Sequence, residues 1–119
     1  GSGKSNILQR YHKNVFTRVS PTIGSEFLTK KIVLGDYQTN YNQGQIWDTS
    51  GSERYRSITT GHYRAAVGAL LVMDITERES FDNLDYWLSQ LRDNSHPSCQ
   101  ICLMANKCDL EDKREVQQD

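Results

Sequence analysis

The run ALLVMDI at residues 69–75 decides the fold of this 119-residue chain. A continuous apolar run of strand length is typical of a strand covered on both faces, so we predict a central strand. Residues 80–93 follow with an apolar stripe at helical spacing, formed by Phe81, Leu84, Leu88 and Leu91. After Pro97, residues 101–105 predict another short buried strand. Strand, helix and strand in this order predict a right-handed parallel crossover in an α/β fold.

The amino-terminal half predicts a helix and a hairpin. GSGKSNILQR at residues 1–10 passes from a glycine-rich loop into helical spacing. Residues 14–25 have mixed polarity and contain Pro21, so we predict a mobile loop. Residues 27–34 and 45–47 predict the two strands of a hairpin, with a long polar connection at residues 37–44.

Composition bounds the class of protein. Fourteen basic and fifteen acidic side chains give a net charge of −1. The chain therefore lacks the basic excess that is typical of nucleic-acid-binding proteins. No apolar run has the length of a membrane span, and no terminal cysteine is present to carry a lipid. Cys99, Cys102 and Cys108 form no even disulfide framework and no zinc spacing, so we interpret them as reduced thiols in and beside a buried strand.

The phosphate chemistry starts at Gly3, Lys4 and Ser5. A glycine turn at a helix start offers converging backbone N–H groups, the lysine offers a cation, and the serine offers a hydroxyl to Mg²⁺. Only the second half of the phosphate-loop pattern is present. In isolation, this stretch is also compatible with an expression scar or a flexible terminus.

Two further motifs complete the pattern. In WDTSGSE at residues 47–53, Asp48 can hold a metal's water shell and Gly51 lets a backbone N–H approach a phosphate, although Asp and Gly also occur in ordinary turns. Thr22 in PTIG can offer its hydroxyl to the same metal, or be plain loop. In NKCD at residues 106–109, Asp109 can accept two hydrogen bonds from guanine, which adenine does not offer.

With these motifs in this order, the chain resembles the Ras-like small GTPases and, within them, the Rab branch. PTIGSEF, WDTSGSERYRSIT, HYRAA, DITERESFDN and ANKCDL follow one another as Rab segments do, over essentially all residues. The resemblance implies a Ras-like P-loop NTPase fold, a mostly parallel sheet with helices on both faces. It also implies a single, truncated G domain at residues 1–119.

The resemblance assigns roles by position. It implies that Lys4 binds the β- and γ-phosphates, that Gly51 senses the γ-phosphate, and that the NKCD residues read guanine. The expected nucleotide-binding residues are Gly1, Ser2, Gly3, Lys4, Ser5, Asn6, Thr22, Gly51, Asn106, Lys107 and Asp109. The expected Mg²⁺ ligands are Ser5, Thr22 and Asp48, and the expected catalytic positions are Ser52 and Lys4.

The chain departs from the family at the position that serves hydrolysis. WDTAGQE is usual, so Ser50 replaces alanine and Ser52 replaces the glutamine that orients the attacking water. The shorter Ser52 lacks both the reach and the second polar group of glutamine. We therefore predict very slow intrinsic and activator-stimulated hydrolysis, the alternative being that another group positions the water.

Other departures concern partners and completeness. In the aromatic trio of Rab proteins, Phe27 and Trp47 match, while His62 replaces tyrosine, either altering partner choice or being a plain surface histidine. The hairpin looks longer than in close relatives, and Gly44 is expected to weaken its strand. Relatives have a buried strand before the phosphate loop, in the middle of the sheet, and further elements after NKxD. Without them we expect a fragment with two separate sheet halves and exposed apolar edges.

Two classes of function follow from the resemblance. One is a GTPase switch of vesicle traffic that binds GTP, GDP and Mg²⁺, and the other is a nucleotide-locked or nucleotide-indifferent scaffold. An ATP-using kinase fits GKS but not NKCD with PTIG. Expected partners are effectors at residues 22–27 and 47–62, exchange factors and GTPase-activating proteins, but not nucleic acid. The expected location is cytoplasmic, at the cytosolic face of an endomembrane, reached through a lipidated tail that this sequence does not contain.

Overall fold

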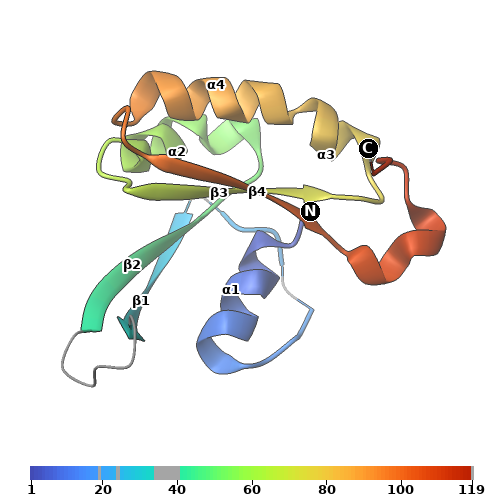
Figure 1. The fold of residues 1–119 in the computed structure, drawn as a ribbon, viewed down its shortest axis with the longest axis horizontal. Coiled ribbons are helices and arrows are strands. Elements are labelled where there is room, and N and C mark those ends of the chain that lie inside the picture. The colour runs from blue at the N-terminus through green and yellow to red at the C-terminus, as the bar shows by residue number, and fades with distance from the viewer. Residues whose placement is uncertain (19, 24, 34–40, 119) are drawn as a thin grey trace.

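A computed structural model describes residues 1–18, 20–23, 25–33 and 41–118, and its strands form two small sheets (Figure 1). The helices and strands, in chain order, are α1 (Lys4–Lys13), β1 (Ser25–Val33), β2 (Tyr41–Thr49), η1 (Glu53–Tyr55), α2 (Arg56–Tyr63), β3 (Gly68–Asp74), α3 (Arg78–Asp82), α4 (Leu84–Asn94), β4 (Gln100–Asn106) and η2 (Cys108–Lys113). None of the helices in the described part of the chain has the length and apolar character needed to cross a membrane.

The first sheet is the predicted hairpin, but its strands are longer than predicted. β1 and β2 pair antiparallel, with Phe27 opposite Trp47 and Lys30 opposite Gly44. β2 begins at Tyr41, so the prediction that residues 41–44 belong to the connection is wrong. The ladder continues through Gly44 because backbone pairing needs no side chain. The first part of the predicted connection, residues 37–40, lies outside the described residues.

The second sheet confirms the predicted crossover. β3 and β4 pair parallel, and the pairing places Leu71 opposite Leu103 and Asp74 opposite Asn106. The single predicted helix over residues 80–93 is wrong, because α3 and α4 are separate helices that meet at Asn83. Asn is a weak helix former. Helices α2, α3 and α4 lie on one side of this sheet, and α4 packs against β3 and α2 (Figure 1).

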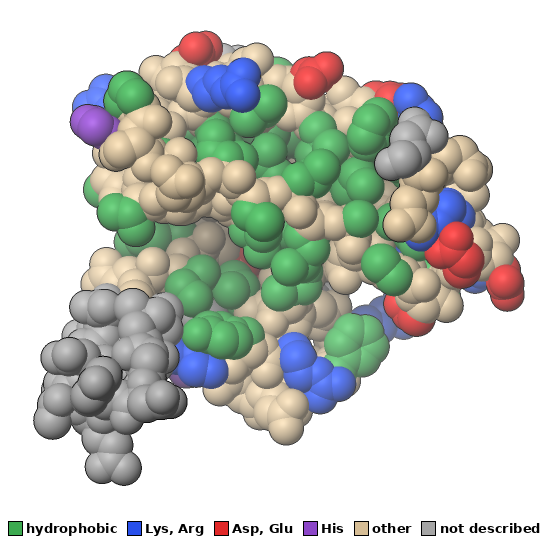
Figure 2. Space-filling view, in the orientation of Figure 1, with side chains coloured by type: hydrophobic (Ala, Val, Ile, Leu, Met, Phe, Trp, Pro, Cys, Tyr) green, Lys and Arg blue, Asp and Glu red, His purple; other side chains and the backbone are tan. Residues whose placement is uncertain are grey.

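Burial differs from the prediction of two covered strands. Met73 and Ile75 are buried with Val116 at the carboxyl end of β3, yet Leu70 is exposed. Most of β4 is exposed, including Leu103 and Cys102, so the predicted burial of this strand and of its thiol is wrong. Figure 2 shows hydrophobic side chains gathered over this layer of the molecule. The reason is that helices α2, α3 and α4 lie on one side of this two-stranded sheet, and among the described strands β3 and β4 pair only with each other.

A cavity of about 860 Å³ lies between the two sheets, lined by segments of α1, β2, β3 and α4. The described strands thus form two separate sheets on either side of this cavity. The α/β character of the predicted fold is confirmed, with one antiparallel and one parallel pair of strands in the described residues. The start of α1, the segment before β1, and the carboxyl ends of β2 and β4 carry the predicted site residues.

Candidate functional site

The predicted phosphate loop forms the start of α1. Gly3 has φ 96°, a left-handed conformation that glycine adopts without strain, and its carbonyl accepts the first helical hydrogen bond, from the backbone N–H of Ile7, at 3.0 Å. The side chain of Lys4 donates to Ser2 Oγ at 3.4 Å, and its ammonium lies beside Gly51. Burial lowers the pKa of Lys4, and the nearby Asp48 carboxylate opposes this shift only in part. A partly desolvated cation at a helix start suits an anionic ligand.

The three predicted metal ligands converge. The hydroxyls of Ser5 and Thr22 lie 2.7 Å apart, and both donate to Oδ2 of the buried Asp48, the threonine at 3.5 Å. The other carboxylate oxygen of Asp48 is buried and meets no hydrogen-bond donor among the described residues. A buried oxygen without a donor is costly. The cluster therefore has spare acceptor capacity for a cation.

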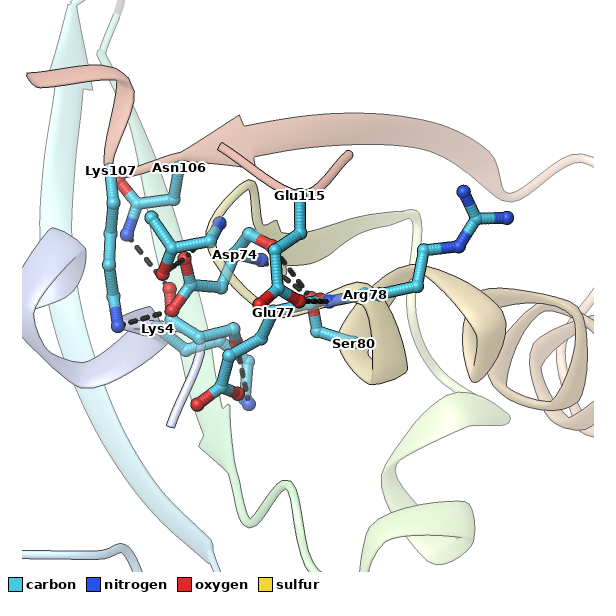
Figure 3. Close-up of polar contacts among 10 residues, drawn as sticks. Lys4, Asp74, Glu77, Arg78, Ser80, Asn106, Lys107 and Glu115 are labelled. Carbon is cyan, nitrogen blue, oxygen red and sulfur yellow. Dashed lines mark hydrogen bonds and ion pairs between the residues drawn. The ribbon is translucent and has the colours of Figure 1, made fainter. Parts of the chain in front are cut away.

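Asn106 joins the predicted base-reading loop to the phosphate loop. It lies at the carboxyl end of β4, and its side-chain amide donates to the carbonyl of Ser2 at 2.8 Å (Figure 3). Lys107, next along the chain, has φ 67° and ψ 35°, and its ammonium pairs with the carboxylate of Asp74. Asp109 is exposed at the start of η2. The structure thus brings together the two ends of the predicted nucleotide site.

The pKa of Asp74 reflects both its burial and its hydrogen bonds. Burial favours the neutral acid, but hydrogen bonds from Lys107 and Thr76 outweigh burial and lower the pKa of Asp74. A carboxyl group whose pKa is lower in the folded protein stabilises the fold above its unfolded pKa. This contribution disappears as the pH falls through the lowered pKa of the folded state. At neutral pH, Asp74 is therefore a stable anion facing Lys107.

The comparison with protein families identifies the chain. The model described as "Ras family" matches residues 1–119. The chain belongs to the Ras family. This membership confirms the predicted family and the predicted class of fold.

Individual relatives of this Ras family member bear Rab and Ypt names. The chain is 48% identical over 118 residues to Ras-related protein RABA6a of Arabidopsis thaliana, covering 98% of this chain and 49% of the relative. It is 49% identical over 115 residues to Ras-related protein Rab11A of Lotus japonicus, covering 96% and 50%. It is 50% identical over 111 residues to GTP-binding protein ypt3 of Schizosaccharomyces pombe, covering 92% and 50%. The chain is a Rab-type member that spans about half the length of these curated relatives.

Ser52, at the usual glutamine position of the family, is held in a local turn. Its backbone N–H donates to Ser50 Oγ at 3.1 Å, and its own Oγ accepts from the backbone N–H of Arg54 at 3.4 Å. Both serines that replace the family residues therefore form hydrogen bonds within this segment. The Ser52 hydroxyl is engaged with its own loop rather than with Lys4 or Asp48.

His62 of this Ras family member links the two segments that flank the site. Its ring stacks on Trp47 with centroids 4.1 Å apart, and Nε2 lies 2.8 Å from Ser25 Oγ at the start of β1. The interpretation of His62 as a plain surface histidine is therefore wrong. The side chain of Phe27, the third member of the predicted trio, lies outside the described side chains.

The sequence interpretation missed three polar residues near the site. Asp74 and Thr76 form the buried network at the end of β3, and Ser25 holds His62. An available signal was the single acid inside the apolar run ALLVMDI, because an unpaired carboxylate is rarely buried. The partner of that acid, Lys107, is distant in sequence and had already been assigned to the base.

We predict that Gly3→Ala weakens nucleotide binding by this Ras family member. A Cβ at Gly3 would collide with the Asn106 side-chain amide, and the left-handed backbone costs alanine about 1 kcal/mol by itself. Moving Asn106 breaks its bond to Ser2, so we expect nucleotide dissociation to become about tenfold faster.

Gly61→Ala is the matched control, because a Cβ there meets nothing within 4 Å and alanine is the better helix former. Dissociation of a fluorescent guanine nucleotide from the full-length natural protein measures both variants. Equal dissociation rates for Gly3→Ala and the unmodified protein would contradict the prediction.

Proposed function

We propose that this chain is the nucleotide-binding part of a Rab-type guanine-nucleotide switch in membrane traffic, with GTP and GDP as ligands and Mg²⁺ as cofactor. The observation that carries the proposal is the convergence of Ser5, Thr22 and Asp48 beside Lys4. These residues come from three separate segments of the chain. The relatives' names, including a "GTP-binding protein", support the same function.

Mg²⁺ suits the chemistry of this cluster. Two hydroxyls and a carboxylate supply the hard oxygen ligands that Mg²⁺ prefers, and the unpartnered Asp48 oxygen can accept a hydrogen bond from metal-bound water. Ser5 and Thr22 would coordinate the ion, and Asp48 would hold it through water. When bound, Mg²⁺ supplies positive charge against the phosphate oxygens.

The chain's own groups then bind the nucleotide from both ends. Lys4 and the backbone N–H groups at the start of α1 offset the phosphate charge, and the backbone N–H of Gly51 contacts the terminal phosphate. Asp109 accepts hydrogen bonds from guanine, and the stem of Lys107 covers its ring. Asn106, through its bond to Ser2, keeps the two ends in one arrangement.

Slow hydrolysis follows from Ser52. Its side chain is shorter than that of glutamine and offers one polar group where glutamine offers two, so we infer that it does not orient the attacking water. The protein therefore stays long in its GTP-bound form once loaded. The alternative is a scaffold that is locked to one nucleotide or indifferent to it.

Partner binding is proposed for the segments next to the site. Residues 22–27 and 47–62 would form the effector surface, and the Ser25–His62 contact ties these two segments together. Exchange factors and GTPase-activating proteins are the other partners implied by the family. We place the full-length protein in the cytoplasm, at the cytosolic face of an endomembrane.

The bound nucleotide tests this proposal directly. We expect that denaturing the purified full-length natural protein releases guanine nucleotide, with GTP forming a large share because turnover is slow. Chromatography of the released material identifies it. GDP alone would contradict slow hydrolysis, while release of no nucleotide, together with no uptake of added GDP and Mg²⁺, would contradict the proposed binding function.

A further inference from the structure

Asp74 stands at the carboxyl end of β3 with no exposed surface. A buried carboxylate needs hydrogen-bond donors to compensate for the loss of water. Oδ1 accepts from the backbone N–H of Thr76 at 2.9 Å and from its hydroxyl at 2.7 Å. Oδ2 pairs with the ammonium of Lys107 (Figure 3). One oxygen of this carboxylate is therefore held by Thr76, while the other oxygen faces the ammonium of Lys107.

The sheet explains why Lys107 is that cation. Parallel pairing sets Asp74 opposite Asn106, and the residue after Asn106 leaves the strand in a left-handed conformation. Residues other than glycine adopt this conformation rarely. The turn directs the lysine side chain back across the strand ends, where only a third of it is exposed. Thus the register and the turn together bring the ammonium to Asp74.

We propose that Asp74 is a positioning residue for guanine recognition, acting through Lys107. This inference rests on the proposed guanine-nucleotide function. A lysine side chain has a flexible four-carbon stem, and ordering it costs conformational entropy. By holding the ammonium at the buried end, Asp74 orders the stem before the base arrives, so that the stem lies ready against the ring that Asp109 reads.

Further hydrogen bonds hold the residues next to Asp74 and Lys107 in place. The side-chain amide of Asn106 donates to the carbonyl of Ser2. The hydroxyl of Ser80 accepts from the backbone N–H of Asp74 and donates to its carbonyl, both at 2.9 Å. Beyond the network, Glu115 accepts from the backbone N–H of Arg78 at 3.0 Å (Figure 3). Asp74 is thus held on several sides, and Lys107 forms an ion pair with its carboxylate. Loss of its charge is expected to free the lysine while preserving the backbone arrangement.

The test is a double-mutant cycle on the full-length natural protein, with the dissociation rate of a fluorescent GDP analogue as readout. Asp74→Asn keeps the shape and the acceptor for Thr76 but removes the charge. We expect it to release the analogue about tenfold faster. In a Lys107→Met background, we expect Asp74→Asn to have no further effect, because its action passes through the lysine. Asp82→Asn, which changes an exposed acid paired with Arg78, is the matched control and should dissociate like the unmodified protein.

Each outcome decides the inference. Equal rates for Asp74→Asn and the unmodified protein overturn it, and so do effects that simply add in the double variant, which indicate a structural role. If the unmodified protein binds no guanine nucleotide, the proposed function fails and the inference falls with it. If Asp74→Asn does not fold, Thr76→Val decides, since it keeps both the shape and the Asp74 charge but removes one orienting bond. A roughly threefold faster release supports the inference, and an unchanged rate overturns it.

Discussion

Replacing Ser52 with glutamine is expected to raise the single-turnover rate of GTP hydrolysis by about tenfold to a hundredfold. Glutamine has the length to reach the water and offers both a donor and an acceptor to orient it. Serine at this position accepts the Arg54 N–H and remains within its own turn. Hydrolysis by preloaded protein with Mg²⁺, followed over time at several temperatures, measures the effect.

Ser52→Ala separates length from polarity in that experiment. It removes the hydroxyl without adding reach, so we expect the same slow rate as in the unmodified protein. If Ser52→Gln is no faster than the unmodified protein, another group positions the water. If Ser52→Ala is itself much slower, the serine hydroxyl takes part in the reaction and the proposed impairment is wrong.

Replacing Asp48 with asparagine is expected to abolish most of the effect of Mg²⁺ on nucleotide binding. The amide oxygen still accepts from Ser5 and Thr22, so the local arrangement persists, but the negative charge that holds the metal's water shell is lost. We expect about a hundredfold faster GDP dissociation in millimolar Mg²⁺. We also expect chelation by EDTA to accelerate release strongly in the unmodified protein and only slightly in the variant.

The appropriate control is Asp93→Asn, an exposed acid at the end of α4. It should retain the full response to EDTA. A variant Asp48→Asn that responds to EDTA as the unmodified protein does would show that the carboxylate does not hold the ion. Thermal unfolding of both variants without nucleotide distinguishes a loss of fold from a loss of metal.

The hydroxyl pair at the proposed metal site illustrates what the spacing of residues along a chain does not predict. Ser5 and Thr22 are 17 residues apart, and Asp48 lies 43 residues from Ser5, yet their oxygens form one cluster. Residue type predicted their chemistry, because Mg²⁺ selects oxygen ligands. The resemblance to a family, rather than periodicity, predicted that they meet.

Errors in the predicted fold share one physical cause. The apolar runs of β3 and β4 were predicted to be covered, but β4 is exposed over most of its length and β3 is only partly buried, because helices α2, α3 and α4 cover one side of this sheet. An apolar composition predicts that a strand is suited to a buried position, but it does not predict which neighbouring elements are present to bury it. The break at Asn83 has a similar origin. The apolar stripe continues across α3 and α4, although α3 ends at Asp82 and α4 begins at Leu84.

By itself, the sequence determined the local elements and the chemistry. The apolar runs at β3 and β4 predicted an α/β fold, and the order of GKS, PTIG, WDTSG and NKCD predicted the Ras family, because each depends on residue type over a short stretch. Only the tertiary structure decided which groups pair over long distances. Asp74 meets Lys107, and Ser25 meets His62, because strand register and a left-handed turn set these contacts. The spacing of the residues along the chain predicts neither the strand register nor the conformation of the turn.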